Sequence, residues 1–213
     1  MVQKISAVPA RGRPRSFDTD EVLARVRDTF WKYGYTGTSM DQLSAATGLH
    51  KPSLYGAFGD KKALYLAALE YYLTEVRAEF AAAFAVPTLF DSLYQVSECS
   101  IDKFLRGDED GRGCFMMSTA VPEAARVPEI AQVVRSSMES LERAFLRRFE
   151  RAIDEGEIPA TVDPNVLTMI LVANHYEMSG RARVGYSREE LRTMADRAQD
   201  LVKSLVGFPT NDK

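Results

Sequence analysis

The stretch from Lys51 to Phe58 combines a hydrophobic anchor with several groups that can donate hydrogen bonds. Leu54 and Phe58 stand four positions apart, so in a helix they would share one face and pack on a core. The outward face would then carry an ammonium group, two hydroxyls and a glycine, from Lys51, Ser53, Tyr55 and Gly56. Such groups bind phosphate oxygens and base edges, and glycine permits close approach, so the segment predicts contact with nucleic acid.

A second short helix is expected immediately before this segment. Ser39 and Gln42 form a capping-box pattern at its start, and Gly48 can end it. Pro52 suits the first turn of the following helix, where the backbone amide has no helical partner. Two short helices around a glycine-containing turn predict a helix-turn-helix, whose second helix enters the major groove of DNA.

Lys61 extends this candidate surface, and Tyr55 has a specific role in it. The hydroxyl of Tyr55 can bind a phosphate, and Lys61 adds a charge beside the positive end of the next helix. Both contacts would position the protein on the backbone of the duplex without reading its sequence.

The N-terminus carries a separate basic segment, "RGRPR", that includes Arg11, Arg13 and Arg15. Pro14 disfavours a helix here, so we expect an extended arm. An arginine-rich arm fits the narrow minor groove of A·T-rich DNA, and this string resembles an AT-hook core. A nonspecific electrostatic tether is the alternative.

The distribution of charge supports a polyanionic partner for the N-terminal part only. The chain has a net charge of -3, but residues 1–62 carry ten Lys or Arg and six Asp or Glu, and the remainder carries 17 and 24. Hydrophobic residues make up 46% and charged residues 27%, which is typical of a globular protein. The longest apolar run spans the seven residues from Phe80 to Val86, too short to cross a membrane, so we expect a cytoplasmic protein.

Helical periodicity extends over almost the whole chain, and no segment alternates with period two, so the predicted fold class is all-α. We expect an N-terminal three-helix DNA-binding domain over residues 17–62, after a flexible basic arm at 1–16. A larger helical domain for effector binding and dimerisation would occupy residues 63–213. The expected helices are 19–33, 39–47, 51–58, 61–87, 89–105, 114–125, 128–156, 163–183 and 187–206.

The segment from Phe17 to Tyr65 closely resembles the DNA-binding domain of the tetracycline-repressor (TetR) family of bacterial regulators. The resemblance rests on an ordered set of residues, Phe30, Gly34, Thr38, Leu43, Ala46, Gly48, Leu54, Tyr55, Phe58, Lys61 and Leu64. It implies a homodimer that binds an operator through paired recognition helices and releases it when a small molecule enters the C-terminal domain. Beyond residue 85 the similarity covers only the helical plan.

The resemblance also implies that Thr38, Tyr55 and Lys61 contact phosphates. His50 stands where the family usually has Ser or Thr, so it either caps the recognition helix or contacts phosphate itself. The full set expected to contact DNA is Arg11, Arg13, Arg15, Thr38, Ser39, His50, Lys51, Pro52, Ser53, Tyr55, Gly56 and Lys61.

An effector site in the larger domain would be a cavity between helices, lined by apolar, aromatic and methionine side chains with a few polar anchors. We expect a small, largely apolar effector. The candidate lining residues are Phe104, Cys114, Phe115, Met116, Met117, Met138, Phe145, His175, Tyr176 and Met178. Ordinary core packing is the alternative for each of them.

The sequence contains no catalytic motif, and with two histidines and two cysteines it offers no metal-ligand spacing. We therefore expect neither an enzyme nor a bound cofactor or metal. Cys114 follows a Gly- and Asp-rich loop and lies near Arg112, so it is either a thiol sensor of oxidants or electrophiles, or an inert buried cysteine.

The last two helices carry apolar stripes that could pair with their copies in a second subunit as a four-helix bundle. The leading hypothesis is thus a ligand-responsive dimeric regulator, more often a repressor in this family. The alternatives are an architectural DNA binder without a ligand and a helical enzyme that has kept a DNA-binding domain.

Overall fold

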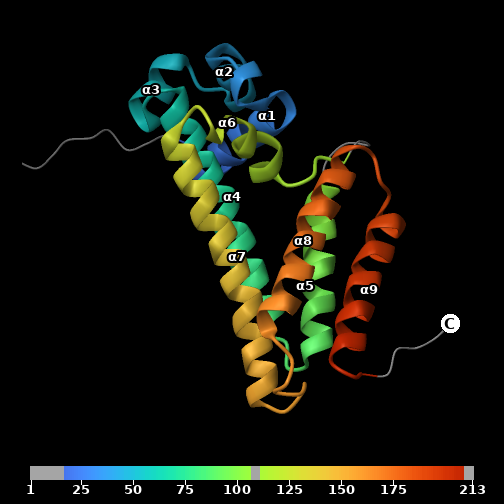
Figure 1. Ribbon diagram of the computed structural model, residues 1–213. Helices are drawn as coiled ribbons and strands as arrows, with labels where there is room; N and C mark the ends of the chain where they lie inside the picture. The colour runs from blue at the N-terminus through green and yellow to red at the C-terminus, as the bar shows by residue number, and fades with distance from the viewer. Residues whose placement is uncertain (1–16, 107–110, 209–213) are drawn as a thin grey trace, which may run out of the picture.

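The computed structural model describes residues 17–106 and 111–208, and every regular element within them is helical (Figure 1). The predicted all-α fold class is therefore confirmed. The elements are α1 Thr19–Gly37, α2 Met40–Thr47, α3 Lys51–Phe58, α4 Lys61–Phe84, α5 Leu89–Phe104, the π-helical turn η1 Met116–Ala120, α6 Val121–Ala124, α7 Pro128–Asp154, α8 Pro164–Arg183 and α9 Arg188–Leu205.

Side-chain caps fix the starts of α2 and α4. The hydroxyl of Ser39 accepts from the amide of Gln42, whose side chain accepts from the Ser39 amide, so the predicted capping box of α2 is confirmed. Asp60 caps α4 by accepting from the amide of Ala63. The turn between α2 and α3 comprises Gly48, with φ of 72°, Leu49 and His50, one position later than the sequence indicated.

Helix α1 breaks where the sequence predicted its end. Gly34 has φ of 73° and ψ of 170°, outside the helical region, and the chain makes one further turn to Gly37. The hydroxyl of Thr38 donates to the carbonyl of Gly34 at 2.6 Å and so fixes the corner between α1 and α2.

The helix predicted over residues 114–125 is present, but it contains a π-helical turn that the sequence did not predict. A π-helical turn occupies Met116–Ala120 and the short α6 follows it, with the amide of Val121 donating to the carbonyl of Met116. Pro122 explains the departure, because it has no amide to donate and its ring clashes with the carbonyl four residues earlier. The wider turn accommodates the ring.

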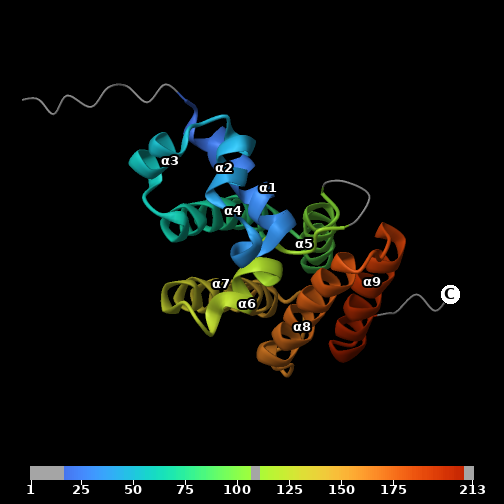
Figure 2. The ribbon, with the colours of Figure 1, turned by 90° about the horizontal axis from the view of Figure 1, so that it is seen from above.

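The two long helices α4 and α7 contact each other and connect the helix-turn-helix end of the molecule to the rest (Figures 1 and 2). One hydrophobic cluster joins α1 to α4 with Phe104, Phe115 and Met178, so it crosses the predicted domain boundary. A second cluster packs the distal ends of α4 and α7 with α5, α8 and α9. Within the described ranges, no helix is both long and apolar enough to span a bilayer.

Candidate DNA-binding surface and ligand cavity

Helix α3 projects from the end of the molecule and exposes most of its surface (Figure 2). Leu54 is fully buried, whereas Tyr55 is 48% exposed. Pro52, Ser53 and Gly56 are also exposed. The helix is therefore held by one buried leucine and by partly buried flanks, and its outer face is open to a large partner.

The charged group at the start of α3 is held by a neighbouring helix. The ammonium of Lys51 lies 2.6 Å from a carboxylate oxygen of Asp41 on α2, and both side chains are substantially exposed. Exposed pairs of this kind contribute only about 0–1 kcal/mol, so Lys51 can exchange Asp41 for a phosphate at little cost.

His50 occupies the N-cap position of α3, but its side chain makes no capping hydrogen bond and is exposed. The structure therefore gives no support to the capping alternative. Its ring lies at the corner next to the exposed face of α3, which leaves the phosphate contact as the remaining prediction.

The other predicted contact residues around the motif differ in exposure. Ser39 is exposed, while Thr38 is 2% exposed and its hydroxyl already donates to Gly34. Lys61 is partly exposed and its ammonium lies 4.7 Å from the ring centroid of Tyr35. Burial lowers the pKa of Lys61. Arg11, Arg13 and Arg15 lie outside the described residues.

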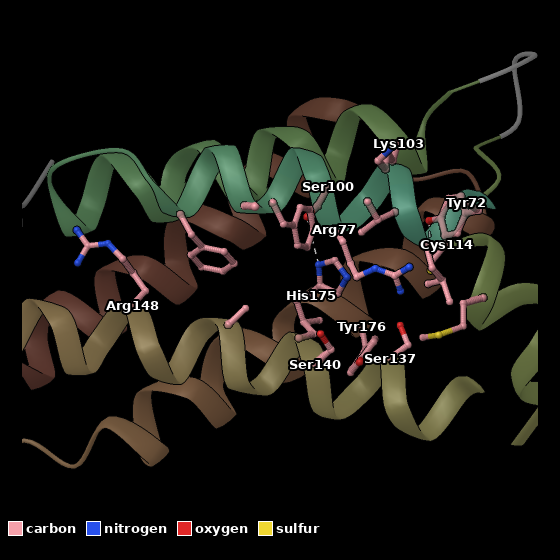
Figure 3. Close-up of a pocket in the computed structure, with 18 of the residues that line it drawn as sticks. Tyr72, Arg77, Ser100, Lys103, Cys114, Ser137, Ser140, Arg148, His175 and Tyr176 are labelled. Atoms are coloured by element: carbon pink, nitrogen blue, oxygen red, sulfur yellow. Dashed lines mark hydrogen bonds between the residues drawn. The ribbon is translucent and has the colours of Figure 1, made fainter. Parts of the chain in front are cut away.

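A cavity of about 550 Å³ lies among α4, α5, α7 and α8, with Cys114 at one end (Figure 3). Its volume is within the range of pockets that hold drug-sized ligands. Apolar walls come mainly from α4 and α7. They include Leu73, Val76, Phe80, Ala81, Phe84, Leu141 and Ala144.

Five of the predicted ligand-binding residues line this cavity, namely Phe104, Cys114, Met116, His175 and Tyr176. The others do not line it and belong to the packing of the molecule. Phe115 packs on Trp31, Tyr65 and Tyr72, and Phe145 packs edge-on against Phe84. Met117, Met138 and Met178 belong to the cluster that joins the two parts of the chain. These five residues pack in the core and do not line this cavity.

Sequence reasoning missed the contribution of α4 to the cavity. Tyr72, Val76 and Phe80 form part of the apolar stripe from which the helix was predicted, and the stripe was interpreted as core. It also missed Ser137 and Ser140, which line the cavity from α7 (Figure 3). The available signal was the presence of two serines next to the apolar stripe of α7.

His175 is a buried polar group of the cavity wall. It is 8% exposed, and its Nδ1 lies 3.2 Å from Oγ of Ser100. Its ring contacts the rings of Phe80, Phe104 and Tyr176. Burial among these groups lowers the pKa of His175 to about 4, so the imidazole is neutral near pH 7.

Tyr176, the next residue, has a buried hydroxyl that finds no hydrogen-bond partner among the described residues. Burial raises the pKa of this phenol, so it stays protonated at all ordinary pH values. An unsatisfied buried hydroxyl costs about 1–3 kcal/mol.

The charged residues of the cavity wall are cations, and most are paired with carboxylates outside the cavity. Lys103 pairs with Glu79 and Arg148 with Glu157, each at 2.9 Å. Arg151 pairs with Glu155 at 3.8 Å, and Arg77 pairs with Glu70. Arg147 is exposed and forms no ion pair with any described residue.

Cys114 is buried, and the hydroxyl of Tyr72 donates to its sulfur at 3.5 Å. Burial raises the pKa of the thiol, which disfavours the reactive thiolate. The structure thus gives no support to Cys114 as a sensor of electrophiles.

Trp31 of α1 connects the cavity wall to the helix-turn-helix. Its indole nitrogen donates to the carbonyl of Arg112 at 3.0 Å, and its ring lies 5.3 Å from Tyr72 and 5.4 Å from Phe115, centroid to centroid. Tyr72 lines the cavity, so one side chain touches both the cavity and α1.

Two polar contacts reinforce this junction between the two parts of the chain, and a third lies next to it. Tyr65 and Thr119 share a buried hydrogen bond of 2.8 Å. Thr36 donates to Glu123 at 2.8 Å, and Lys62 pairs with Glu129 at 2.5 Å.

Helices α8 and α9 pack on each other at the side of the molecule away from α3 (Figure 2). Both expose large apolar side chains, with Met169 at 64% and Leu201 at 49% exposure. Val166, Val184 and Leu205 are exposed as well. Exposed apolar residues gathered on two neighbouring helices are typical of a protein interface.

Among the residues that the structure describes, no cluster of His, Cys, Asp or Glu side chains could hold a metal ion.

Comparison with known families gave two matches along the chain. Residues 22–68 match the family described as "Bacterial regulatory proteins, tetR family", and residues 100–198 match "Tetracyclin repressor-like, C-terminal domain".

Two curated bacterial proteins are similar over almost the full length. The HTH-type transcriptional repressor ComR of Escherichia coli is 30% identical over 203 residues, which cover 92% of this chain and 94% of ComR. The uncharacterised HTH-type transcriptional regulator YezE of Bacillus subtilis is 28% identical, covering 87% of this chain and 96% of YezE.

Solved structures share the fold. A cysteine mutant of the TetR family transcriptional regulator CifR, complexed with 26-base-pair operator DNA, is 30% identical with a TM-score of 0.77, covering 87% of this chain and 97% of that one. A TetR transcriptional regulator from Chloroflexus aurantiacus is 25% identical with a TM-score of 0.78, covering 88% and 94%.

Proposed function

Because the chain belongs to the TetR family of bacterial transcriptional regulators, we propose that it is a dimeric, ligand-responsive repressor. In this proposal α3 binds a palindromic operator, and a small molecule in the cavity causes release of the DNA. Residues 17–62 would form the DNA-binding domain and residues 63–213 the effector-binding and dimerisation domain.

The DNA contacts follow from the exposed surface of α3. Lys51, Ser53 and Gly56 would approach base edges and phosphates in the major groove, flanked by Pro52. Tyr55, Lys61, Ser39 and His50 would hold the phosphate backbone. The operator-bound structure of the 30% identical CifR mutant supports double-stranded DNA as the partner.

Dimerisation would use the exposed apolar side chains of α8 and α9 in a four-helix bundle with a second copy. Two recognition helices can then read two half-sites about 34 Å apart, which one short helix cannot do alone.

The observation that carries the regulatory part is the position of Tyr72, which lines the cavity and packs edge-on against Trp31 of α1. A ligand that moves Tyr72 would act on α1 and through it on the orientation of α2 and α3. Such a ligand can shift the protein away from its DNA-binding state only through different affinities for the two states.

The DNA-binding part can be tested by selecting duplexes from a random-sequence library with the purified full chain. We expect enriched duplexes with inverted repeats whose centres lie about one helical turn apart. Enrichment of duplexes without any repeated half-site would contradict the proposal that a dimer binds the operator.

The dimer can be tested with the double variant Leu201→Glu and Leu205→Glu. We expect sedimentation as a monomer and loss of affinity for the selected duplex. Thr193→Glu, an exposed position on the same helix but off the apolar stripe, is the matched control and should remain dimeric. A double variant that stays dimeric would exclude this interface.

The regulatory part can be tested with Trp31, the only tryptophan of the chain. A compound that fills the cavity should change the fluorescence of Trp31 and weaken binding of the selected duplex over the same concentration range. Binding in the cavity with no change in duplex affinity would contradict ligand control.

A further inference from the structure

The polar groups inside the cavity are few and complementary. They are concentrated where α8 faces α5 and α7, and include His175, Tyr176, Ser137 and Ser140 (Figure 3). The rest of the lining is largely apolar, apart from cations that are mostly paired. The hydrogen bonds that this cluster can donate and accept therefore determine which polar group of a ligand it can bind.

The hydrogen bonds of Ser100 determine which nitrogen of His175 carries the proton. The Ser100 hydroxyl has one proton and donates it to the carbonyl of Val96 at 2.7 Å, a shorter contact than the 3.2 Å to Nδ1. Ser100 must then accept from Nδ1–H. A neutral imidazole carries one proton, so Nε2 is left as a hydrogen-bond acceptor.

Nε2 of His175 has no hydrogen-bond partner among the described residues, and Figure 3 shows the Nδ1 edge of the ring turned toward Ser100, with the rest of the ring among the cavity-lining side chains. The adjacent Tyr176 presents a hydroxyl that is also unpartnered. The cavity wall thus carries one obligate acceptor and, on the adjacent residue, one buried hydroxyl that can donate.

A hydroxyl group is the simplest ligand group that satisfies both residues, because it donates to Nε2 and accepts from the phenol. A carboxylate has no proton for Nε2, and four of the five cations in the wall already face carboxylates of their own. A cationic ligand would face an excess of Lys and Arg in the lining.

We propose that the cavity binds an uncharged, largely apolar molecule through a hydroxyl group, phenol or alcohol, held between His175 and Tyr176. Phe80, Phe84 and Leu141 would enclose its apolar part, and Ser137 and Ser140 would tolerate small differences in its position. The inference deepens the proposed function, because it assigns a chemical class to the effector of the same site.

Three probes of one shape test the inference: 2-naphthol, naphthalene and 2-naphthoate, each titrated into the full chain by calorimetry at pH 7. We expect 2-naphthol to bind about three- to tenfold more tightly than naphthalene, the worth of one or two neutral hydrogen bonds. The carboxylate should bind more weakly than 2-naphthol. Equal binding of all three, or tightest binding of 2-naphthoate, would overturn the proposal.

Tyr176→Phe removes the unpartnered hydroxyl without removing the ring, so it should leave the thermal unfolding temperature unchanged or slightly raised. In this variant the preference for 2-naphthol over naphthalene should shrink by the worth of one hydrogen bond, because only the bond to Nε2 of His175 remains. Tyr94→Phe, which removes a hydroxyl from an exposed tyrosine outside the cavity, is the matched control and should keep the full preference for 2-naphthol. A preference that is undiminished in Tyr176→Phe would contradict the assignment.

Binding and DNA release are separate measurements, so the two proposals can fail separately. A hydroxyl preference that depends on Tyr176, without release of the selected duplex, would support this inference and contradict ligand control of DNA binding. Release by naphthalene or 2-naphthoate, but not by 2-naphthol, would support ligand control and contradict the hydroxyl assignment.

Discussion

The proposed DNA-binding surface and the cavity are built from the sequence in different ways. The surface uses residues from Ser39 to Lys61, held by local caps and turns and by one buried leucine of α3. The cavity wall takes residues from Tyr72 to Tyr176, on helices that only tertiary packing brings together. Most side chains are exposed to solvent at the first site, and most are buried at the second.

This difference separates the substitutions that should affect folding from those that should affect binding alone. At the surface, function lies on the outer face of α3 and stability on the inner one. In the cavity the same side chains contribute to both ligand binding and stability, because a wall residue is also a core residue.

The largest effect is expected from Leu54→Ala, at the buried anchor of α3. The substitution removes three carbons from a fully buried site and should lower the free energy of unfolding by about 3 kcal/mol in urea titrations. Tyr55→Ala, the exposed neighbour, should change it by less than about 0.5 kcal/mol. Similar losses for both variants would show that α3 does not have separate anchoring and outward faces.

A slightly smaller effect is expected from protonation of His175. Its folded-state pKa is about 4 and the unfolded value is 6.5, so between these values the unfolded chain binds more protons and stability falls as pH falls. The contribution is complete above pH 6.5, and about 2 kcal/mol of it should be lost at pH 5.

Denaturant titrations at pH 7.5 and pH 5 measure this loss against two variants. His175→Asn should reduce the pH dependence, whereas the exposed His50→Gln should keep it. A wild-type pH dependence that survives in His175→Asn would show that other groups cause it.

At the surface, Ser53→Ala and Lys51→Ala should change which duplexes are selected without changing stability. A lost base contact changes the preference at that base pair by about 1–3 kcal/mol. Binding to a panel of single-base variants of the selected duplex measures this change. A uniform loss over the whole panel would indicate phosphate contacts and contradict the role of these residues as readers.

The smallest effect is expected from Tyr55→Phe, which removes one hydroxyl from the outer face of α3. It should weaken all duplexes alike, by about 1 kcal/mol, because a phosphate contact carries no sequence information. Anisotropy titrations with selected and scrambled duplexes provide the comparison. A loss of affinity confined to the selected duplex would show that Tyr55 contacts bases instead of phosphates.

The fold could be predicted well from the sequence where local chemistry decides it. The Ser39–Gln42 capping box, Gly48 and Leu54 define α2 and α3 through interactions within a few residues. The π-helical turn at Met116–Ala120 was missed, because its cause, Pro122, was not weighed against an apolar pattern that suggested one continuous helix.

The cavity was only half predictable for a related reason. His175 and Tyr176 stood out as polar or aromatic groups in an apolar helix, and they line the cavity. Met138 and Phe145 were chosen on similar grounds, as large side chains of an apolar stripe, but they pack in the core. Periodicity shows that a residue is buried, but it does not show whether the space beside it is filled. That depends on how α4, α5, α7 and α8 diverge.

Helix α3 is proposed to read the sequence of a duplex. The ratio of dissociation constants for the scrambled and the selected duplex, measured with the full chain at about 150 mM salt, tests this most directly. We expect a ratio of about a thousand or more, which falls sharply in Ser53→Ala or Lys51→Ala. A wild-type ratio near one would contradict it and would identify an architectural DNA binder instead.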